Sequence, residues 1–510
     1  MKRIIKTPLE ALRQVSAPAL RAISGRFEAS VARGYVSRTA AHGGFGTDEP
    51  GFLMDQAVGE AVRLDDKLDR LRREVTKASA FARKPRIAFF SPFPPRKSGV
   101  SDYSMFLLEE LTRYYRVDLF HDAGYEPETG SGEYACHDYR LFDRLASARD
   151  YHCAVYQMGN SHYHNFMYRT LLRHRGLVTL HDFCLGGFHL YYGSGLTMIR
   201  EELLQWHGED REEIVRALEE WGNDLNAIQR GCAARGWYLN RRVLDAAQVM
   251  IVHSPWCESR VRSGSAEYAD RTLVVPHGIH PRHTTSAERA ATRNRFSLPH
   301  DALIIASFGF VHPDKMSPQA LDAYAAIARD VPNSLFVFVG EEADGGAVQR
   351  HADSLGLTDR VRFLGHQPAE AFAALIAVTD LGVNLRKPPT NGETSGALLN
   401  LLAAGVATVV TDVDTFSDYP SSVVRKIHWE SEGADGLLSA MQGLATMSDA
   451  REELGWSALA YVKAHHAWAK VGRQYRDAIE RCHDELSRSR GENASAGANT
   501  ATNDVLLLNR

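Results

Sequence analysis

The sequence has few cysteines, no long apolar run and no large excess of charge of either sign. Its six cysteines lie far apart in 510 residues, without a Cys-x-x-Cys pair or other metal-ligand spacing, which argues against a disulfide scaffold or a zinc module. No apolar run approaches the roughly 18 residues of a membrane span, and the N-terminal residues lack a signal-peptide core. A net charge of −4 gives no general attraction to nucleic acid. We therefore expect a cytoplasmic protein with free thiols, in which any anion-binding site is local.

Strands and helices are predicted to alternate from Pro85 onward. With 510 residues, of which 44% are hydrophobic, the chain is long enough for two or three domains. Short apolar runs that end in polar residues alternate with segments of helical periodicity, a pattern typical of α/β domains with parallel sheets. The polar segment 281–299 is bounded by prolines and lacks periodicity, so we expect a hinge there between two such domains.

The most informative stretch is residues 383–411, VNLRKPPTNGETSGALLNLLAAGVATVVT. It predicts a strand, a cationic turn-rich loop, a helix opened by Glu393–Gly396, and a second strand. The free N–H groups of the first helical turn, the helix dipole and Arg386 are expected to converge on one point outside the sheet, as in sites that hold a phosphate or diphosphate. The alternative is an ordinary capped helix in a doubly wound domain.

Similar signals follow the strands predicted in the first half of the chain. The loop SPFPPRKSGV, after the strand at 86–90, brings Gly99 to the head of a helix, where a glycine permits close approach of a ligand. Polar, histidine-containing segments follow four other predicted strands: Gln157–His164, His181–Asp182, His253–Ser254 and Pro276–Gly278. Because ligands bind beyond the carboxyl ends of parallel strands, this clustering indicates a binding site.

Three segments differ from this alternating pattern. Residues 1–35 carry seven Lys or Arg interleaved with apolar residues, which predicts either a basic amphipathic helix on anionic lipid or a solvated extension. Residues 198–246 are helix-rich and strongly charged, and we expect an insertion that forms a lid or a partner surface. From Gly491 the composition is that of a disordered tail.

Together, three groups of motifs resemble the family 4 retaining glycosyltransferases of the GT-B fold. They are SPFPPRKSGVSDYS after the first strand, VVPHGI at the end of the first half, and SFGFVHPDK with NLRKPPTNGETSG in the second half. YQMGNSHYH and LHD are similar to a subgroup that acts in bacterial polysaccharide assembly. The resemblance covers Pro85 to Cys482. It implies an α/β protein with two Rossmann-like domains facing each other across a cleft, here preceded by a helical extension.

The resemblance also implies an activity. A hexosyltransferase of this kind moves a sugar, with retention, from a GDP- or UDP-linked donor to a glycan or lipid-linked acceptor in bacterial cell-surface polysaccharide biosynthesis. It needs no metal or other cofactor. From the charge and composition we expect no nucleic-acid partner and a cytoplasmic location, and if residues 1–35 form the basic helix, peripheral contact with the inner face of an anionic membrane. The expected domains are a helical, partly basic extension at 1–82, an acceptor-binding domain at 83–285 with a helical insertion at 195–246, a nucleotide-sugar-binding domain at 286–465, a C-terminal helix at 466–488 returning to the first domain, and a disordered tail at 489–510.

Individual site residues follow from the same motifs. Lys315 would contact the donor diphosphate, Glu393 the sugar hydroxyls, and His181 is similar to the family's acceptor-domain histidine near the sugar. The predicted donor-binding residues are Gly99, Lys315, Arg386, Glu393, Thr394, Ser395 and Gly396. The predicted catalytic residues are His181, Asp182 and Glu393.

The sequence departs from the family pattern at two positions. The family has a second glutamate eight residues after the first, but Leu401 stands eight residues after Glu393, and counting back from the end of the helix gives Asn400. Many relatives have an arginine where this sequence has Phe310. We predict that Arg386 supplies the missing cation, because charge at the diphosphate is needed when no metal is present.

Two other interpretations remain open. Phe310 and Leu401 also suit a catalytically weak or inactive GT-B partner or scaffold subunit, and an epimerase or phosphorylase on a similar fold is a further alternative. Asp412 and Asp414 imitate the DxD metal motif of other sugar transferases, and the His465–Trp468 segment imitates a metal cluster. Their positions in a surface turn and beside a helix argue against a metal site.

Overall fold

The computed structural model describes residue 63 and residues 84–130, 134–192, 195–206, 211–264, 266–342 and 345–507. The chain divides into two compact units. One comprises Met1–Lys84 and Arg140–Asp150, and the other comprises Pro85–Tyr139 and Tyr151–Arg510. In the former, helix α5 (Phe142–Ala148) is described. The extension predicted at 1–82, apart from Arg63, lies outside the described residues.

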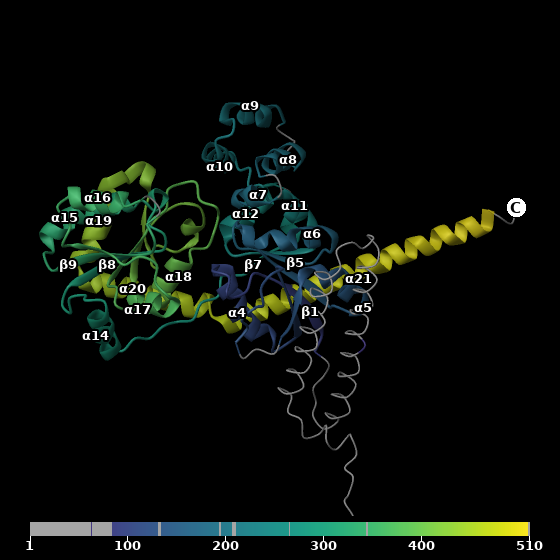
Figure 1. The fold of residues 1–510 in the computed structure, drawn as a ribbon, viewed down its shortest axis with the longest axis horizontal. Helices are drawn as coiled ribbons and strands as arrows, with labels where there is room; N and C mark the ends of the chain where they lie inside the picture. Colours follow the sequence, from purple (N-terminus) through teal and green to yellow (C-terminus); the bar gives the residue numbers. More distant parts are fainter. Residues whose placement is uncertain are drawn as a thin grey trace, which may run out of the picture. The chain divides into compact units, whose positions relative to one another are not determined.

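Seven parallel strands form the first sheet of the larger unit, here called sheet A. Their order is β3-β2-β1-β4-β5-β6-β7. Strands β1, β5 and β7 are labelled in Figure 1. The strands are β1 (Arg86–Phe90), β2 (Arg116–His121), β3 (Ala135–Asp138), β4 (Cys153–Met158), β5 (Leu177–Leu180), β6 (Val249–Val252) and β7 (Thr272–Val274). Strands β4 and β5 are buried throughout, which explains their mostly apolar sequences. The aligned rings of Phe90, Phe120 and Tyr156 stack at 4.8 and 4.7 Å.

Helices connect the strands of sheet A. They are α4 (Gly99–Leu111), α6 (Asn165–Arg173), α7 (Gly186–Tyr191), α11 (Arg241–Ala246), α12 (Pro255–Gly264) and α13 (Ala266–Asp270). The expected insertion contains α8 (Leu196–Trp206), α9 (Arg211–Trp221) and α10 (Leu225–Ala234). It has a small core of its own, to which α9 contributes Ile214, Ala217, Leu218 and Trp221 at helical spacing.

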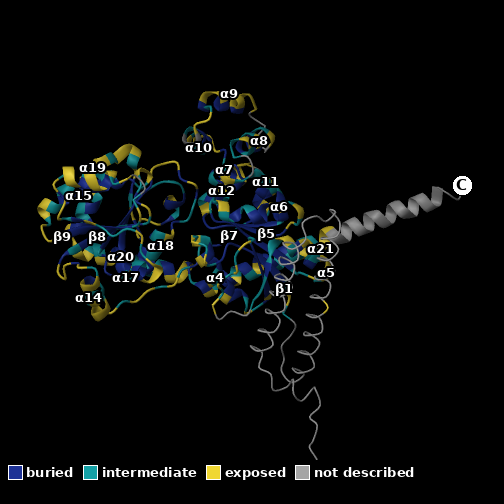
Figure 2. Cartoon of the chain, in the orientation of Figure 1, coloured by how far each residue is buried: buried dark blue, intermediate teal, exposed yellow. Residues whose placement is uncertain are grey.

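Six parallel strands form the second sheet, sheet B, in the order β10-β9-β8-β11-β12-β13. The strands are β8 (Leu303–Phe308), β9 (Ser334–Val339), β10 (Val361–Phe363), β11 (Leu381–Asn384), β12 (Ala407–Thr411) and β13 (Arg425–Ile427). The helices are α15 (Ser317–Asp330), α16 (Ala347–Ser354), α17 (Ala369–Ala377), α18 (Gly396–Ala403), α19 (Trp429–Thr446) and α20 (Ser448–His465). Strands β9, β11 and β12 are buried throughout, and exposed residues lie on the surrounding helices (Figure 2). The predicted α/β class with two Rossmann-like parallel sheets is confirmed.

We had expected the segment 281–299 to lack regular structure, but it contains helix α14 (Ser286–Arg295). The helix begins with a capping box, in which the Thr285 hydroxyl accepts from the Glu288 N–H and the Glu288 carboxylate accepts from the Thr285 N–H. The Thr-x-x-Glu spacing is a sequence signal for this start. The buried Arg293 side chain then ties α14 to β11, since it donates to Asp380 Oδ2 at 2.9 Å.

Helix α21 (Trp468–Leu507) packs its first half against sheet A and α4. Val471, Tyr475 and Ile479 join the core of that sheet, and the Tyr475 hydroxyl lies 3.0 Å from the Tyr103 hydroxyl of α4. The helix continues past residue 488, so residues 489–507 are helical where we expected a disordered tail. Adding turns to a helix that is already nucleated costs little. Among the described helices, none is long and apolar enough to cross a membrane.

The Arg293 contacts predict a large effect on stability. Its guanidinium also donates to the carbonyls of Pro299, His300 and Ala302 at 2.8 to 2.9 Å. Arg293→Met should therefore lower the free energy of unfolding by about 3 kcal/mol, because it leaves three carbonyls without this donor and removes one of the two arginines that pair with Asp380. Arg295→Met, which removes a 4.0 Å ion pair of two exposed side chains, is the control and should cost under about 0.5 kcal/mol. Urea unfolding measures both, and equal losses would contradict this account.

Candidate functional site

The loops after β8 and β11 start at one edge of sheet B, because the two strands are neighbours. After β8 the chain turns at Gly309, whose φ of +94° lies in the left-handed region that favours glycine. The short helix η4 (Pro313–Lys315) follows, and it places Lys315 Nζ 3.5 Å from the position of a Cβ on Gly309. The Lys387 N–H donates to the Asp314 carbonyl at 2.8 Å, which joins the two loops directly.

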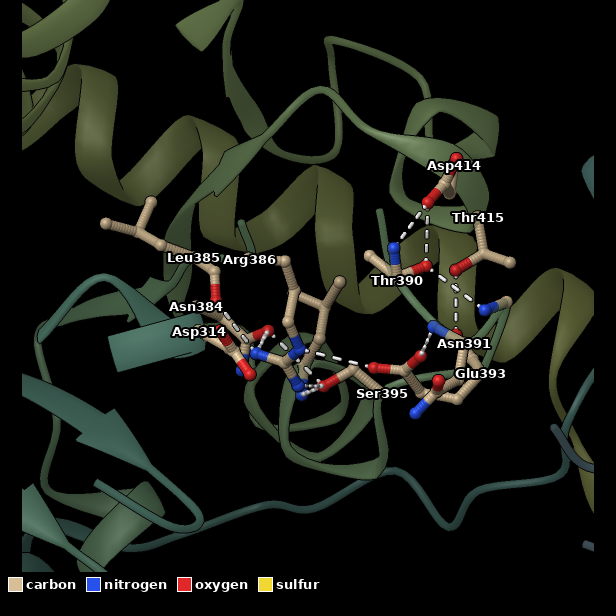
Figure 3. A network of polar contacts seen from close by, with 12 residues as sticks. Asp314, Asn384, Leu385, Arg386, Thr390, Asn391, Glu393, Ser395, Asp414 and Thr415 are labelled. Carbon is tan, nitrogen blue, oxygen red and sulfur yellow. Dashed lines mark hydrogen bonds and ion pairs between the residues drawn. The ribbon is translucent and has the colours of Figure 1, made fainter. Parts of the chain in front are cut away.

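Polar contacts fix the loop between β11 and α18 in one conformation (Figure 3). Thr390 donates from its N–H and its hydroxyl to Asp414 Oδ2, at 2.8 and 2.9 Å. Its hydroxyl also accepts from the Gly392 N–H at 3.1 Å. The Thr415 hydroxyl donates to the Glu393 carbonyl at 2.7 Å. Asp414 and Thr415 follow β12, so the loop is held from the strand beside β11.

Arg386 lies inside this loop, with 7% of its surface exposed. Its Nε donates to Glu393 Oε1 at 3.3 Å, and its two terminal nitrogens donate to the Leu385 carbonyl at 2.9 Å and to Ser395 Oγ at 3.4 Å. The other carboxylate oxygen of Glu393 accepts from the Asn391 N–H at 3.1 Å. The predicted diphosphate-binding cation is therefore the ion-pair partner of the predicted sugar-binding glutamate, and both stabilise the shape of the loop.

Lys315 is a cation at the same edge of sheet B that the loop between β11 and α18 does not bind. Among the described residues, its amine makes no hydrogen bond or ion pair with a side chain of the loop. Burial and the neighbouring Arg386 charge together lower the pKa of Lys315 to about 7, although the Glu393 carboxylate opposes the shift. An anion beside this amine would favour its charged form, so the site gains a full cation when a phosphate binds.

Two helix N-termini with open glycines belong to the predicted site. Gly396 begins α18, where the Ser395 hydroxyl accepts from the Leu398 N–H at 3.2 Å, and Gly99 begins α4. Among the described residues, nothing lies within 4 Å of a Cβ built on either glycine, and neither has a positive φ. The packing of the described protein therefore does not require glycine at these two positions. The N–H groups of a first helical turn lack intrahelical partners and suit an anion.

His181 follows β5 and is buried in a hydrogen-bonded network. Its Nδ1 lies 3.2 Å from His253 Nε2, and His253 Nδ1 donates to the Val275 carbonyl at 2.9 Å. Burial and the neighbouring imidazoles hold the pKa of His181 well below its usual value, and burial lowers the pKa of His253 to about 4. Both rings are therefore neutral near pH 7, so His181 donates from Nδ1 to His253.

Gln157 completes the environment of His181. Its amide oxygen lies 2.8 Å from His181 Nε2, which is an acceptor in this tautomer, and its amide nitrogen has no partner among the described residues. Turning the amide so that its nitrogen faces His181 satisfies both groups, and we assign it that way. The ring of Tyr103 packs edge-on against the imidazole of His181, with 4.7 Å between the two ring centroids. His181 is thus held in one tautomer by side chains of its own domain.

Asp182, the next residue, is tied to the loop after β4. The Asn160 N–H donates to Asp182 Oδ2 at 2.8 Å. Burial raises the pKa of Asp182 to about 7, and the Glu393 carboxylate raises it too. Asp182 and Glu393 are therefore close enough to interact, although they belong to the edges of different sheets.

Backbone contacts bring these two edges together. The N–H groups of Phe183 and Cys184 donate to the Asn391 carbonyl at 2.9 and 2.8 Å. Gly392 has a φ of +67°, and a Cβ there would lie 2.6 Å from Phe183 Cβ and 2.8 Å from the Trp256 ring. Both the backbone conformation and the packing therefore require glycine at 392. The structure thus brings His181 and Asp182 to the loop that carries Glu393.

The candidate metal motifs have other partners. Asp412 lies 3.3 Å from Lys426 Nζ and 3.1 Å from His428 Nδ1, while Asp414 holds Thr390. His466 Nδ1 donates to the His277 carbonyl at 2.8 Å. In the part of the chain that the structure describes, no group of three or more side chains could hold a metal ion. That the reaction needs no metal stays a prediction.

The two departures from the family pattern differ in their surroundings. Leu401 is fully buried in the core of sheet B, so it faces no ligand. Asn400 donates from its amide to the Gly396 carbonyl at 2.8 Å. Phe310, in contrast, is 64% exposed beside Gly309. The second glutamate of the family pattern therefore has no counterpart at Leu401.

Sequence reasoning missed the residues that hold the site in place. Asp414 is 24 residues from Thr390, which it fixes, and the Asn391 carbonyl binds N–H groups more than 200 residues earlier. Gln157 was noted only as part of a polar strand end. No local spacing signals these contacts, because they depend on how loops from different strands meet.

The chain was compared with protein families and characterised proteins. The family described as "Glycosyl transferases group 1" matches residues 288–458. The D-inositol 3-phosphate glycosyltransferase of Stackebrandtia nassauensis is 30% identical over 235 residues, 42% of this chain and 50% of that protein. The enzyme of that name from Nocardia farcinica is 28% identical over 213 residues, 39% of this chain and 45% of that protein. The chain thus spans about half the length of these curated relatives.

Solved structures resemble the chain over most of its length. WaaG, a glycosyltransferase involved in lipopolysaccharide biosynthesis, has a TM-score of 0.52 at 14% identity, covering 77% of this chain and 99% of that one. Anabaena HepE in complex with UDP has a TM-score of 0.51 at 14% identity, with 78% and 100% covered. Sucrose-phosphate synthase from Thermosynechococcus elongatus has a TM-score of 0.53 at 17% identity, with 78% and 98% covered. Such likeness concerns the fold. Residues 288–458 are therefore a glycosyl transferases group 1 domain, within a chain of GT-B fold.

Proposed function

We propose that the protein is a family 4 retaining glycosyltransferase. It transfers a sugar from a GDP- or UDP-linked donor to a glycan or lipid-linked acceptor, in the biosynthesis of a bacterial cell-surface polysaccharide. The observation that carries this proposal is Lys315, an unengaged amine that shares one edge of sheet B with the N-terminus of α18. The matched domain at 288–458, the UDP held by HepE and the role of WaaG in lipopolysaccharide biosynthesis support it.

In this proposal the donor diphosphate lies between Lys315 and the first turn of α18. When the bond between the anomeric carbon and the phosphate oxygen breaks, negative charge develops on the leaving diphosphate. A fixed cation and oriented N–H groups stabilise that charge without reorganising. Arg386 adds positive charge from inside the loop, although its direct partner is Glu393. Gly99 and Gly396 leave room for the phosphates to approach the two helix N-termini.

Glu393 would receive the hydroxyls of the donor sugar, which gains positive charge in the transition state. Its carboxylate is already held by Arg386 and the Asn391 N–H, so it is oriented before the sugar arrives. An acceptor hydroxyl then forms the new bond on the face that the diphosphate leaves, and its proton goes to the departing phosphate oxygen. His181 and Asp182 approach this region from the edge of sheet A. Contact of residues 1–35 with an anionic membrane stays a prediction on residues outside those described.

The lowered pKa of Lys315 predicts a pH dependence of nucleotide binding. The amine is charged below its pKa of about 7, and only the charged form attracts a diphosphate. The affinity for UDP should therefore fall as pH rises from 7 to 9, by at most about tenfold per pH unit. Lys315→Arg stays charged over this range and should bind UDP with little pH dependence. Calorimetry at several pH values measures this, and a wild-type affinity that does not change with pH would contradict the assignment.

Glu393→Gln separates binding of the nucleotide from transfer of the sugar. Glutamine keeps the hydrogen-bonding oxygen but removes the charge, so UDP should bind within about threefold of wild type at pH 6.5, where Lys315 is mostly charged. Turnover of the nucleotide sugar should fall about 10²-fold, because the lost charge acts on the transition state. Glu370→Gln, at a 93% exposed side chain of the same domain, is the control and should change neither quantity.

The same measurements separate the enzyme from the scaffold alternative. A scaffold subunit would release no nucleoside diphosphate from any of a panel of nucleotide sugars. If wild-type protein also binds no nucleoside diphosphate at millimolar concentration, the transferase proposal is wrong. Loss of UDP binding in Glu393→Gln together with loss of turnover would instead show that Glu393 serves the fold of the loop alone.

A further inference from the structure

A row of planar side chains crosses the carboxyl edge of sheet A. The Arg96 guanidinium carbon lies 4.6 Å from the ring centroid of Tyr125 and 5.8 Å from that of Tyr163. The rings of Tyr163 and His162 are 4.1 Å apart, and those of His162 and Tyr191 are 5.6 Å apart. These five side chains are called the aromatic row. Each member touches the next, so they form one continuous strip.

The order of the row follows the order of the strands. Tyr125 lies in the loop after β2, Arg96 in the loop after β1, and His162 and Tyr163 in the loop after β4. Tyr191 ends α7, the helix that follows β5. Since the sheet order is β2-β1-β4-β5, the row runs across four neighbouring strand ends on the side where ligands bind in such sheets.

The middle of the row lies in a loop that also holds a residue of the proposed site of sugar transfer. His162 and Tyr163 share their loop with Asn160, whose N–H holds the Asp182 carboxylate at 2.8 Å. Asp182 interacts electrostatically with Glu393, and the adjoining backbone contacts Asn391. A ligand lying along the row would therefore pass beside the loop that holds Asp182.

The row is accessible rather than part of a core. Tyr191 is 64% exposed and His162 is exposed, while Arg96, Tyr125 and Tyr163 are half-buried. The Tyr125 hydroxyl accepts from the Phe93 N–H at 3.1 Å, which fixes its ring. Tyrosine offers a rigid apolar face with a polar tip, at a low entropic cost of binding. The apolar faces and hydroxyl edges of sugar rings match this surface.

Local charge favours a neutral ligand over an anionic one. Asp122 lies 3.9 Å from Arg96, so the guanidinium already has a counter-charge. Glu126 and Glu128 follow in the same loop, and the Glu128 N–H donates to the Pro94 carbonyl at 2.8 Å, which ties this acidic loop to the loop of Arg96. Asp122, Glu126 and Glu128 outnumber Arg96 and Lys97 in these two loops, so the charge near Tyr125 gives no net attraction to an anionic ligand.

We propose that the aromatic row binds an acceptor that is a neutral glycan chain of several sugars. Successive rings of the chain lie against Tyr125, Tyr163, His162 and Tyr191, beside the loop that holds Asp182, and one hydroxyl of the chain is the acceptor. This rests on the proposed function and specifies the acceptor: the enzyme elongates a glycan rather than glycosylating a small phosphorylated acceptor. The curated relatives, named for D-inositol 3-phosphate, would differ from this protein in that respect.

The test is affinity electrophoresis of the full chain in native gels that contain dextran, laminarin or a yeast mannan. At least one polysaccharide should retard wild-type protein. Tyr163→Ala and Tyr191→Ala should each raise the dissociation constant about three- to tenfold, because each removes a stacking ring. Tyr163→Phe and Tyr191→Phe keep the ring and should be retarded like wild type. Trp456→Ala removes a 71% exposed ring elsewhere on the protein and should have no effect.

Three results would overturn the proposal. They are no retardation by any of the polysaccharides, an equal loss in Trp456→Ala, and tight calorimetric binding of D-inositol 3-phosphate by a protein that no polysaccharide retards. Release of UDP from UDP-sugar without acceptor is measured on the same samples. The Tyr163 and Tyr191 variants should keep that release, since neither residue contacts the proposed donor site. Release of UDP without glycan binding would contradict only the acceptor proposal. Glycan binding by a protein that neither releases UDP nor binds a nucleotide would contradict only the proposed transferase activity.

Discussion

The ion pair between Arg386 and Glu393 determines the shape of the loop on which the candidate site depends. A buried guanidinium without a partner is costly, typically by several kcal/mol, so Arg386 fixes the position of the glutamate seven residues later. The same carboxylate accepts from the Asn391 N–H, and this leaves the Asn391 carbonyl bound to the edge of sheet A. One side-chain contact thus connects the proposed sugar site, the loop backbone and the residues after β5.

The two sheets contribute different kinds of group to this region. Sheet B supplies positive charge and a helix N-terminus, with Lys315 as the amine that is free to take up an anion. Sheet A supplies neutral groups: His181, held in one tautomer, and Asp182, whose raised pKa keeps much of it protonated near pH 7. Separation of charge from neutral hydrogen-bonding groups suits transfer of a sugar from a charged carrier to an uncharged hydroxyl.

The sequence predicts local features well and loop geometry poorly. Apolar runs predict the strands of both sheets because their residues are buried, and the Gly and Pro positions locate the turns. The ion pair of Arg386 was not foreseen, since the conformation of the loop, rather than spacing, brings it to Glu393. The aromatic row was not predicted for the same reason: its members are spread over residues 96–191 and meet only through the order of the strands.

The central claim is that Lys315 and the first turn of α18 hold the diphosphate of a nucleotide sugar, while Arg386 stays paired with Glu393. A crystal structure of the protein with UDP tests it most directly. The account predicts phosphate oxygens within hydrogen-bond distance of Lys315 Nζ and of the N–H groups that begin α18, with the contact between Arg386 and Glu393 retained. A diphosphate bound by Arg386 after its release from Glu393, or bound away from Lys315, would contradict the account.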